Sequence, residues 1–238
     1  MSDARREKAE RIRSLLATEG DSVLANTTTF NEGRYESVAR LDDYEELKDR
    51  ARAIKEDAIA DLPALIDRVT EAVEANGGTV YVADDAADAR EYVGRVVDDR
   101  DAETVVKSKS MTSEEIEVND HLESLGVDVW ETDLGEFVLQ VADEAPSHIV
   151  APAIHHSREE ITALFEDVFD PAQPLDSADA LTDFASDYLA DRIREADVGM
   201  TGANFVAAES GTIALVTSEG NARKTVASTD THVAVAGV

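Results

Sequence analysis

Mainly apolar segments of four or five residues alternate with longer helical patterns through the middle of the chain. These segments show little polar alternation, as expected for strands that are covered on both faces. A helix between successive strands lets them run parallel, because a parallel pair needs a long crossover connection. The strands are expected at 79–83, 104–108, 127–131, 148–151 and 198–201, and the helices at 86–99, 157–168 and 177–195. Residues 134–142 fit either a helix or a strand, and we favour the helix. This alternation predicts an α/β fold with a largely parallel sheet and flanking helices.

The two ends of the chain differ from this middle part. Helices are expected at 4–17, 35–58 and 62–75, with a polar break at 26–33. We therefore predict a helical N-terminal extension over residues 1–60 and an α/β domain over residues 61–238. Near the C-terminus, strands are expected at 205–209, 212–217 and 232–237, with a hairpin turn at Ser210–Gly211.

One further helix is expected in the middle of the chain. Thr112 and Glu115 have the spacing of a capping box for a helix that runs to about Ser124.

The formal charge of −30, from 52 acidic and 22 basic side chains, argues against two classes of partner. A chain without a basic surplus lacks the electrostatic footprint of nucleic-acid binding, and anionic membrane surfaces repel it. No apolar run reaches the roughly 20 residues of a membrane helix. The charged N-terminus lacks the apolar stretch of a signal peptide, so we expect no membrane insertion and a cytoplasmic location. Such acidity is typical of halophilic proteins, because salt screens their self-repulsion.

Lysine is scarce in this chain, so its positions are informative. Lys107 and Lys109 follow the strand expected at 104–108, in the run Lys107-Ser108-Lys109-Ser110, immediately before a helix. Two ammonium groups, two hydroxyls and the N–H groups of a helix start can hold a small carboxylate or phosphate ligand. The alternatives are two surface lysines beside an ordinary helix cap, or an ion pair with a carboxylate such as Glu131.

Polar residues also follow the other expected strands, and ligands bind at the carboxyl ends of strands in open parallel sheets. Glu131, Asp133 and Glu136 could supply a general base or ligate a hard cation, and a solvated acidic loop is the alternative. We select Glu131, Asp133 and His155 as candidate catalytic residues for proton transfer. The further candidate ligand-binding residues are Thr201, Gly202, Asn204, Glu219, Asn221 and Arg223. The histidines show neither HExxH nor HxH spacing, so no metal site is predicted.

Four long segments of this sequence resemble the LUD domain of lactate-utilisation proteins. They are VVKSKSMTSEEIEVNDHL, VWETDLGEFVLQ, PSHIVAPAIHHSREEI and VGMTGANFVAAESGTIALVTSEGNARKT, in that order along the chain. The resemblance is dense from about Thr79 to Val238 and is strongest to the iron–sulfur, B-type members. It implies the fold shared by ribose-5-phosphate isomerase and the CoA transferases, which agrees with the α/β prediction.

The resemblance also implies a function. The B-type proteins belong to a system of several subunits that oxidises L-lactate to pyruvate, so other lactate-utilisation subunits are the expected partners. [4Fe–4S] clusters are implied on a cysteine-rich C-terminal region or on a partner subunit, whereas this chain, which has no cysteine, is expected to hold none. The alternatives are a sugar-phosphate isomerase or CoA-transferase-like enzyme of the same fold, and a non-catalytic assembly subunit.

Overall fold

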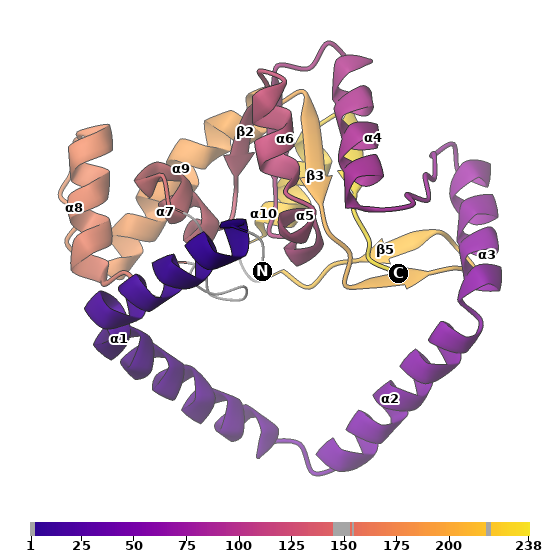
Figure 1. Ribbon diagram of the computed structural model, residues 1–238, viewed down its shortest axis with the longest axis horizontal. Helices are drawn as coiled ribbons and strands as arrows, with labels where there is room; N and C mark the ends of the chain where they lie inside the picture. The colour runs from indigo at the N-terminus through magenta and orange to yellow at the C-terminus, as the bar shows by residue number, and fades with distance from the viewer. Residues whose placement is uncertain (1–2, 145–152, 154, 218–219) are drawn as a thin grey trace. The chain divides into compact units, whose positions relative to one another are not determined.

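The computed structural model describes residues 3–144, 153, 155–217 and 220–238. It divides into two compact units, of which one comprises residues 1–57 and 138–181 and the other residues 58–137 and 182–238. Figure 1 shows the elements of both units along the chain. Among the helices of the described residues, none has the length and apolar character needed to cross a membrane.

A four-stranded, all-parallel sheet forms the centre of the second unit. Its strand order is β2-β1-β3-β6, and the strands span Thr104–Lys107 (β1), Asp128–Glu131 (β2), Val198–Thr201 (β3) and Thr231–Ala234 (β6). Lys107 is the register partner of both Glu131 on β2 and Met200 on β3. Lys107 and Glu131, the last residues of β1 and β2, therefore lie side by side and next to Met200, the second-last residue of β3. We call this carboxyl end of the strands the carboxyl edge of the sheet. The α/β prediction with a parallel sheet is confirmed.

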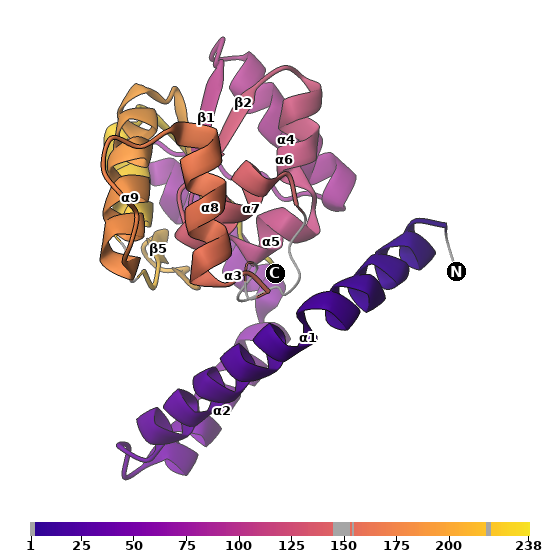
Figure 2. The same ribbon diagram turned by 90° about the vertical axis from the view of Figure 1, so that its left-hand side faces the viewer.

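Helices cover both faces of this sheet. Val105 and Val129 pack with valines of α4 (Ala86–Asp98) and with α6 (Val118–Ser124), and Figure 2 shows α4 and α6 side by side next to β2. Alternate residues of a strand point to opposite faces. Trp130 accordingly meets α9 (Ala178–Glu195) on the other face, where the Arg192 guanidinium lies 4.6 Å from its ring centre. Gly199 lies on that face too, against α10 (Asn221–Ser228).

A two-stranded hairpin and the helix that it contacts also belong to the second unit. The strands β4 (Phe205–Ala207) and β5 (Thr212–Ala214) pair antiparallel, and Gly211 in their turn has φ of +69°. A Cβ atom at Gly211 would come within 3.1 Å of the Val73 backbone nitrogen in α3 (Leu62–Ala75), so this close approach requires glycine. The remaining helices are α1 (Asp3–Val38), α2 (Tyr44–Ala60), α5 (Met111–Glu115), α7 (Leu134–Ala142) and α8 (Arg158–Phe169).

The predicted polar break at 26–33 is wrong, because α1 continues through it. The hydroxyls of Thr27 and Thr28 donate to carbonyls four residues earlier, at 2.7 and 2.8 Å. Polar side chains that bond back to their own helix in this way remain compatible with it. The predicted helix at 35–58 is instead divided, since α1 ends at Val38 and α2 begins at Tyr44.

Three further expectations need correction. Residues 79–83 form no strand, and Tyr81 instead stacks on Tyr92 and donates its hydroxyl to Asp88 at the start of α4. The single helix expected from Thr112 to about Ser124 is divided into α5, which Ser110 caps by accepting the N–H of Ser113, and α6, which begins at Val118 after Glu117 with φ of +54°. The helix α10 was not predicted. The strand expected at 148–151 lies outside the described residues.

Candidate functional site

The carboxyl ends of β1 and β2 place two charged side chains in direct contact. Lys107 Nζ lies 2.8 Å from Glu131 Oε1, and the two side chains are only 1% and 7% exposed. Their positions follow from the sheet, because register partners on parallel strands project to the same face. Asn119 of α6 donates to the same Glu131 oxygen at 2.6 Å, and the Ser113 hydroxyl lies 3.4 Å from Lys107 Nζ. Lys107 thus has the carboxylate partner that the sequence left as an alternative to a ligand.

The two serines of the Lys-Ser-Lys-Ser run are buried and take part in packing. Ser108 donates its backbone N–H to the Met200 carbonyl at 3.0 Å, which continues the sheet beyond β1. Ser110 caps α5, and Gly202 packs directly against it. A Cβ atom at Gly202 would come within 2.9 Å of the Ser110 hydroxyl, so glycine permits this approach between the residues that follow β1 and β3.

A second cluster joins Lys109 to the acidic residues at the start of α7. Lys109 Nζ lies 2.8 Å from Glu136 Oε1, and the Lys109 side chain is 30% exposed while that of Glu136 is 7% exposed. Burial, and after it the neighbouring Asp133, raise the pKa of Glu136 from 4.5 to about 8 in total, although Lys109 acts in the opposite direction. The cluster therefore contains a carboxyl group that exchanges its proton near neutral pH and an ammonium group that solvent reaches.

The half-buried side chain of Glu114, on α5, lies near the same lysines. Burial raises the pKa of Glu114, and the positive charge of Lys107 opposes this rise. The surroundings of these carboxyl groups therefore differ. Glu131 is in direct contact with Lys107 and Asn119. At Glu114 and Glu136, burial is the largest cause of the raised pKa. Pairs of groups with such different surroundings are frequent at sites of proton transfer.

Thr201 at the end of β3 and His232, the second residue of β6, form a polar contact. Thr201 Oγ1 lies 3.0 Å from Nε2 of His232, and burial lowers the pKa of His232. Asn221 begins α10 and donates its side-chain amide to the Thr132 carbonyl at 3.1 Å, so it ties α10 to the residue after Glu131. Thr201, Gly202 and Asn221 thus lie at the carboxyl edge where the sequence predicts them.

The other sequence-selected residues have different positions. Asn204 is exposed, and its side-chain oxygen accepts the Val216 N–H at 2.8 Å within the hairpin region. Arg223 is exposed on α10. Glu219 lies outside the described residues. His155 belongs to the first unit, where its Nε2 lies 2.8 Å from Glu144 Oε2.

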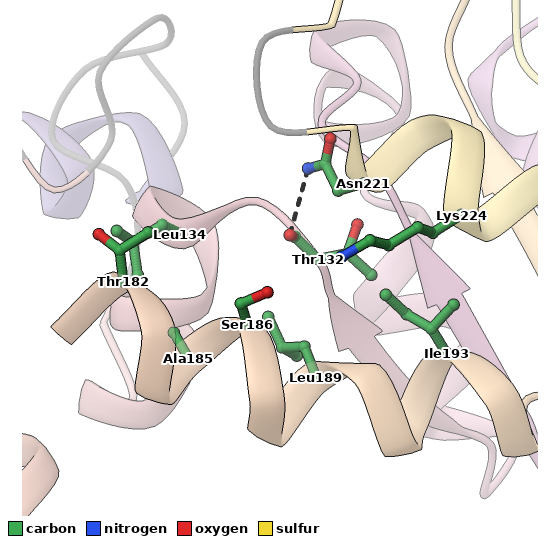
Figure 3. Close-up of a pocket in the computed structure, with 9 residues that line it drawn as sticks. All are labelled: Thr132, Leu134, Thr182, Ala185, Ser186, Leu189, Ile193, Asn221 and Lys224. Carbon is green, nitrogen blue, oxygen red and sulfur yellow. Dashed lines mark hydrogen bonds between the residues drawn. The ribbon is translucent and has the colours of Figure 1, made fainter. Parts of the chain in front are cut away.

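A cavity of about 160 Å³ adjoins the residues that follow β2. Figure 3 shows that α9 forms one wall, with Ser186 and Leu189, and that α10 contributes Asn221 and Lys224. The Lys224 side chain extends along the cavity toward Thr132. The lining thus combines an apolar helix face with one amine, an amide and hydroxyls, which is a composition suited to a small polar ligand.

Sequence reasoning did not select several of these residues. Ser113 and Asn119 complete the surroundings of the Lys107–Glu131 pair, and Lys224 reaches the cavity. The scarcity of lysine was the signal available for Lys224. No sequence signal pointed to Asn119, because its contact with Glu131 depends on how α6 packs against β2.

A parallel sheet flanked by helices, with charged and polar groups gathered at its carboxyl edge, defines an α/β domain of the open-sheet class. Residues 66–238 match the LUD domain family, and the chain belongs to this family. No solved structure matches the chain.

Curated relatives extend the likeness over most of the chain. This chain is 43% identical over 199 residues to a protein of Shouchella clausii named lactate utilization protein B. The aligned region covers 83% of this chain and 42% of the relative. The protein of the same name from Oceanobacillus iheyensis is 40% identical over 211 residues, or 88% of this chain and 44% of the relative. The uncharacterized electron transport protein YkgF of Escherichia coli is 40% identical over 205 residues, or 86% and 43%. The chain thus spans less than half the length of these relatives.

The residues of this chain do not fit an iron–sulfur cluster. Such clusters are held by cysteine thiolates, with histidine as the occasional replacement, and the sequence contains no cysteine. The carboxylate, ammonium and amide groups at the carboxyl edge of the sheet are suited instead to holding an anion and moving a proton.

We expect Lys107→Met to lower the free energy of unfolding by about 3–5 kcal/mol, because it leaves the Glu131 carboxylate buried without its cation. Adding Glu131→Gln should restore part of this loss, since glutamine retains an oxygen that accepts from Asn119. Urea unfolding at neutral pH measures both variants. Lys109→Met is the control, with a smaller expected loss because the Lys109 side chain is partly exposed. A loss below about 1 kcal/mol for Lys107→Met would refute the structural role of the pair.

Glu136 should make stability depend on pH. Its pKa is raised in the folded state from 4.5 to about 8, so folding favours the protonated carboxyl. The stabilisation is complete below the unfolded-state pKa and is lost as the pH rises toward 8. Glu136→Gln, which mimics the protonated group, should therefore gain stability relative to the wild type between pH 5 and pH 8. Denaturant midpoints across this range test it, and parallel profiles for the two proteins would contradict it.

Proposed function

We propose that this chain is the LUD-domain part of a B-type lactate-utilisation component that serves the oxidation of L-lactate to pyruvate. The observation that carries the proposal is the 38–43% identity to several proteins named lactate utilization protein B, which extends over more than four fifths of this chain. The lactate substrate and the other subunits of the system remain part of the proposal, because the chain corresponds to less than half of each relative.

The proposed ligand is a small carboxylate bound at Lys109. Each lysine contacts a buried carboxylate at 2.8 Å, but the Lys107 side chain is 1% exposed, whereas that of Lys109 is 30% exposed and can be reached from solvent. Lys109 would hold the carboxylate of lactate through a charge-assisted hydrogen bond. Glu136 would take up a proton near neutral pH, because burial and the neighbouring Asp133 raise the pKa of Glu136 to about 8.

The other sequence-selected residues have supporting parts in this proposal. Glu131 fixes Lys107 and thereby the end of β1, and Thr201, Gly202 and Asn221 shape the carboxyl edge. Conversion of lactate to pyruvate releases two protons and two electrons, and we propose that one proton goes to Glu136 and the other to solvent. We propose that [4Fe–4S] clusters, which the family resemblance implies, accept these electrons. The clusters would belong to a cysteine-rich region or to a partner subunit, because they need thiolate ligands that this chain lacks.

Growth tests the proposed function directly. Deleting the coding segment for this chain in its source organism should abolish growth on L-lactate as the carbon source, and growth on pyruvate should be unchanged. Restoring the segment should restore growth on lactate. Normal growth of the deletion strain on lactate, in the absence of a second gene of this family, would refute the proposed function.

Binding tests the proposed ligand site. In calorimetric titrations, Lys109→Ala should weaken the binding of L-lactate or pyruvate at least tenfold, because a hydrogen bond to a charged group contributes about 1.5–3 kcal/mol. Lys48→Ala, on α2, is the matched control and should bind as the wild type does. If Lys224→Ala loses binding while Lys109→Ala retains it, the cavity beside α10 is the ligand site and the assignment to Lys109 is wrong. Preference for inorganic phosphate over both carboxylates would favour the sugar-phosphate alternative.

A further inference from the structure

Glu144, His155 and His156 bring three potential metal ligands together in the first unit. The Nε2 atoms of His155 and His156 lie 2.8 and 3.1 Å from the same carboxylate oxygen, Oε2 of Glu144. One ligand atom from each of the three residues lies within 4.8 Å of the other two. The two imidazole rings are 4.1 Å apart between centres, so adjacent residues of the chain direct their rings to one point.

The surroundings of the three side chains suit a bound cation. The His155 side chain is only 4% exposed, His156 is 17% exposed and Glu144 is 39% exposed, so the cluster is buried on one side and open on the other. The nearby carboxylate of Glu160 is already engaged, because it accepts the backbone N–H and the hydroxyl of Ser157 at the start of α8. Glu144 is thus the carboxylate that meets both imidazoles directly.

We propose that Glu144, His155 and His156 form a binding site for a divalent transition metal, with Zn²⁺ as its preferred ion. Two imidazoles and one carboxylate are a ligand set that zinc takes in proteins, at about 2.0–2.2 Å from the metal. Ligand atoms on one tetrahedral zinc ion lie about 3.4 Å apart. The two nitrogen–oxygen separations of 2.8 and 3.1 Å are close to this value. Small side-chain movements would therefore admit the ion.

Three protein ligands leave a fourth coordination position for water or a small anion, which the exposed side of the cluster allows. The metal would also link Glu144, the second residue after α7, to His155 before α8, and these two residues are eleven positions apart in the chain. This site is independent of the Lys109 cluster, because all three ligands belong to the other compact unit. Its failure would leave the proposed lactate function untouched.

Zinc binding to the chelator-treated chain tests the proposal. Calorimetric titration with ZnCl₂ should show one equivalent of tight binding in the presence of excess Mg²⁺, which occupies exposed carboxylates but competes poorly for imidazole. His155→Gln, His156→Gln and Glu144→Gln should each weaken this binding at least tenfold. His121→Gln, which changes a histidine on α6 in the other unit, is the matched control and should bind as the wild type does.

Cobalt supplies a second readout. Co²⁺ in the wild-type site should give visible absorption bands typical of nitrogen and oxygen ligands, and these bands should disappear in His156→Gln. His156 is the more exposed of the two histidines, so this variant is the one expected to fold normally, which circular dichroism verifies. Zinc affinity that is equal in the wild type and all three variants, or that Mg²⁺ abolishes, would overturn the proposal and assign the metal to the acidic surface.

Discussion

The ion pair between Lys107 and Glu131 is the interaction on which the carboxyl edge of the sheet depends. Both side chains are almost fully buried, so each would carry a large desolvation cost without the other. Their contact requires β1 and β2 to be parallel and in the observed register, since a shift by one residue would turn one side chain to the opposite face. Asn119 and Ser113 add α6 and α5 to the same arrangement.

Because Glu131 neutralises Lys107, the second lysine of the run has a different environment. Lys109 lies at the rim and meets Glu136, whose pKa is raised to about 8 by burial and by Asp133. Lys107 and Lys109, which only Ser108 separates in the sequence, therefore differ in exposure and in their carboxylate partner. One stabilises the edge of the sheet, and the other provides a charge that a solvent-borne anion can reach. Lys107 thus has a structural role, and the proposed binding role belongs to Lys109.

Local patterns predicted elements where sequence and packing agree. The apolar runs of β1, β2 and β3 and the helices α4, α7, α8 and α9 were found, because these segments bury one continuous face or both. The predictions were wrong where the local sequence is compatible with two backbone structures. The threonines near residue 27 suggested a break but bond back into α1, and the apolar run at 79–83 resembles a strand although its Tyr81 packs against α4.

The sequence by itself determined the α/β class, the family likeness and the run of lysines and serines after β1, because periodicity and motif spacing are properties of neighbouring residues. Only the tertiary structure decided which partner each charge has. Lys107 meets Glu131 through strand pairing, Asn119 reaches them through the packing of α6, and Glu144 meets His155 although eleven positions separate them in the chain. The physical reason is that burial and electrostatic pairing depend on distances in space, which spacing along the chain does not give.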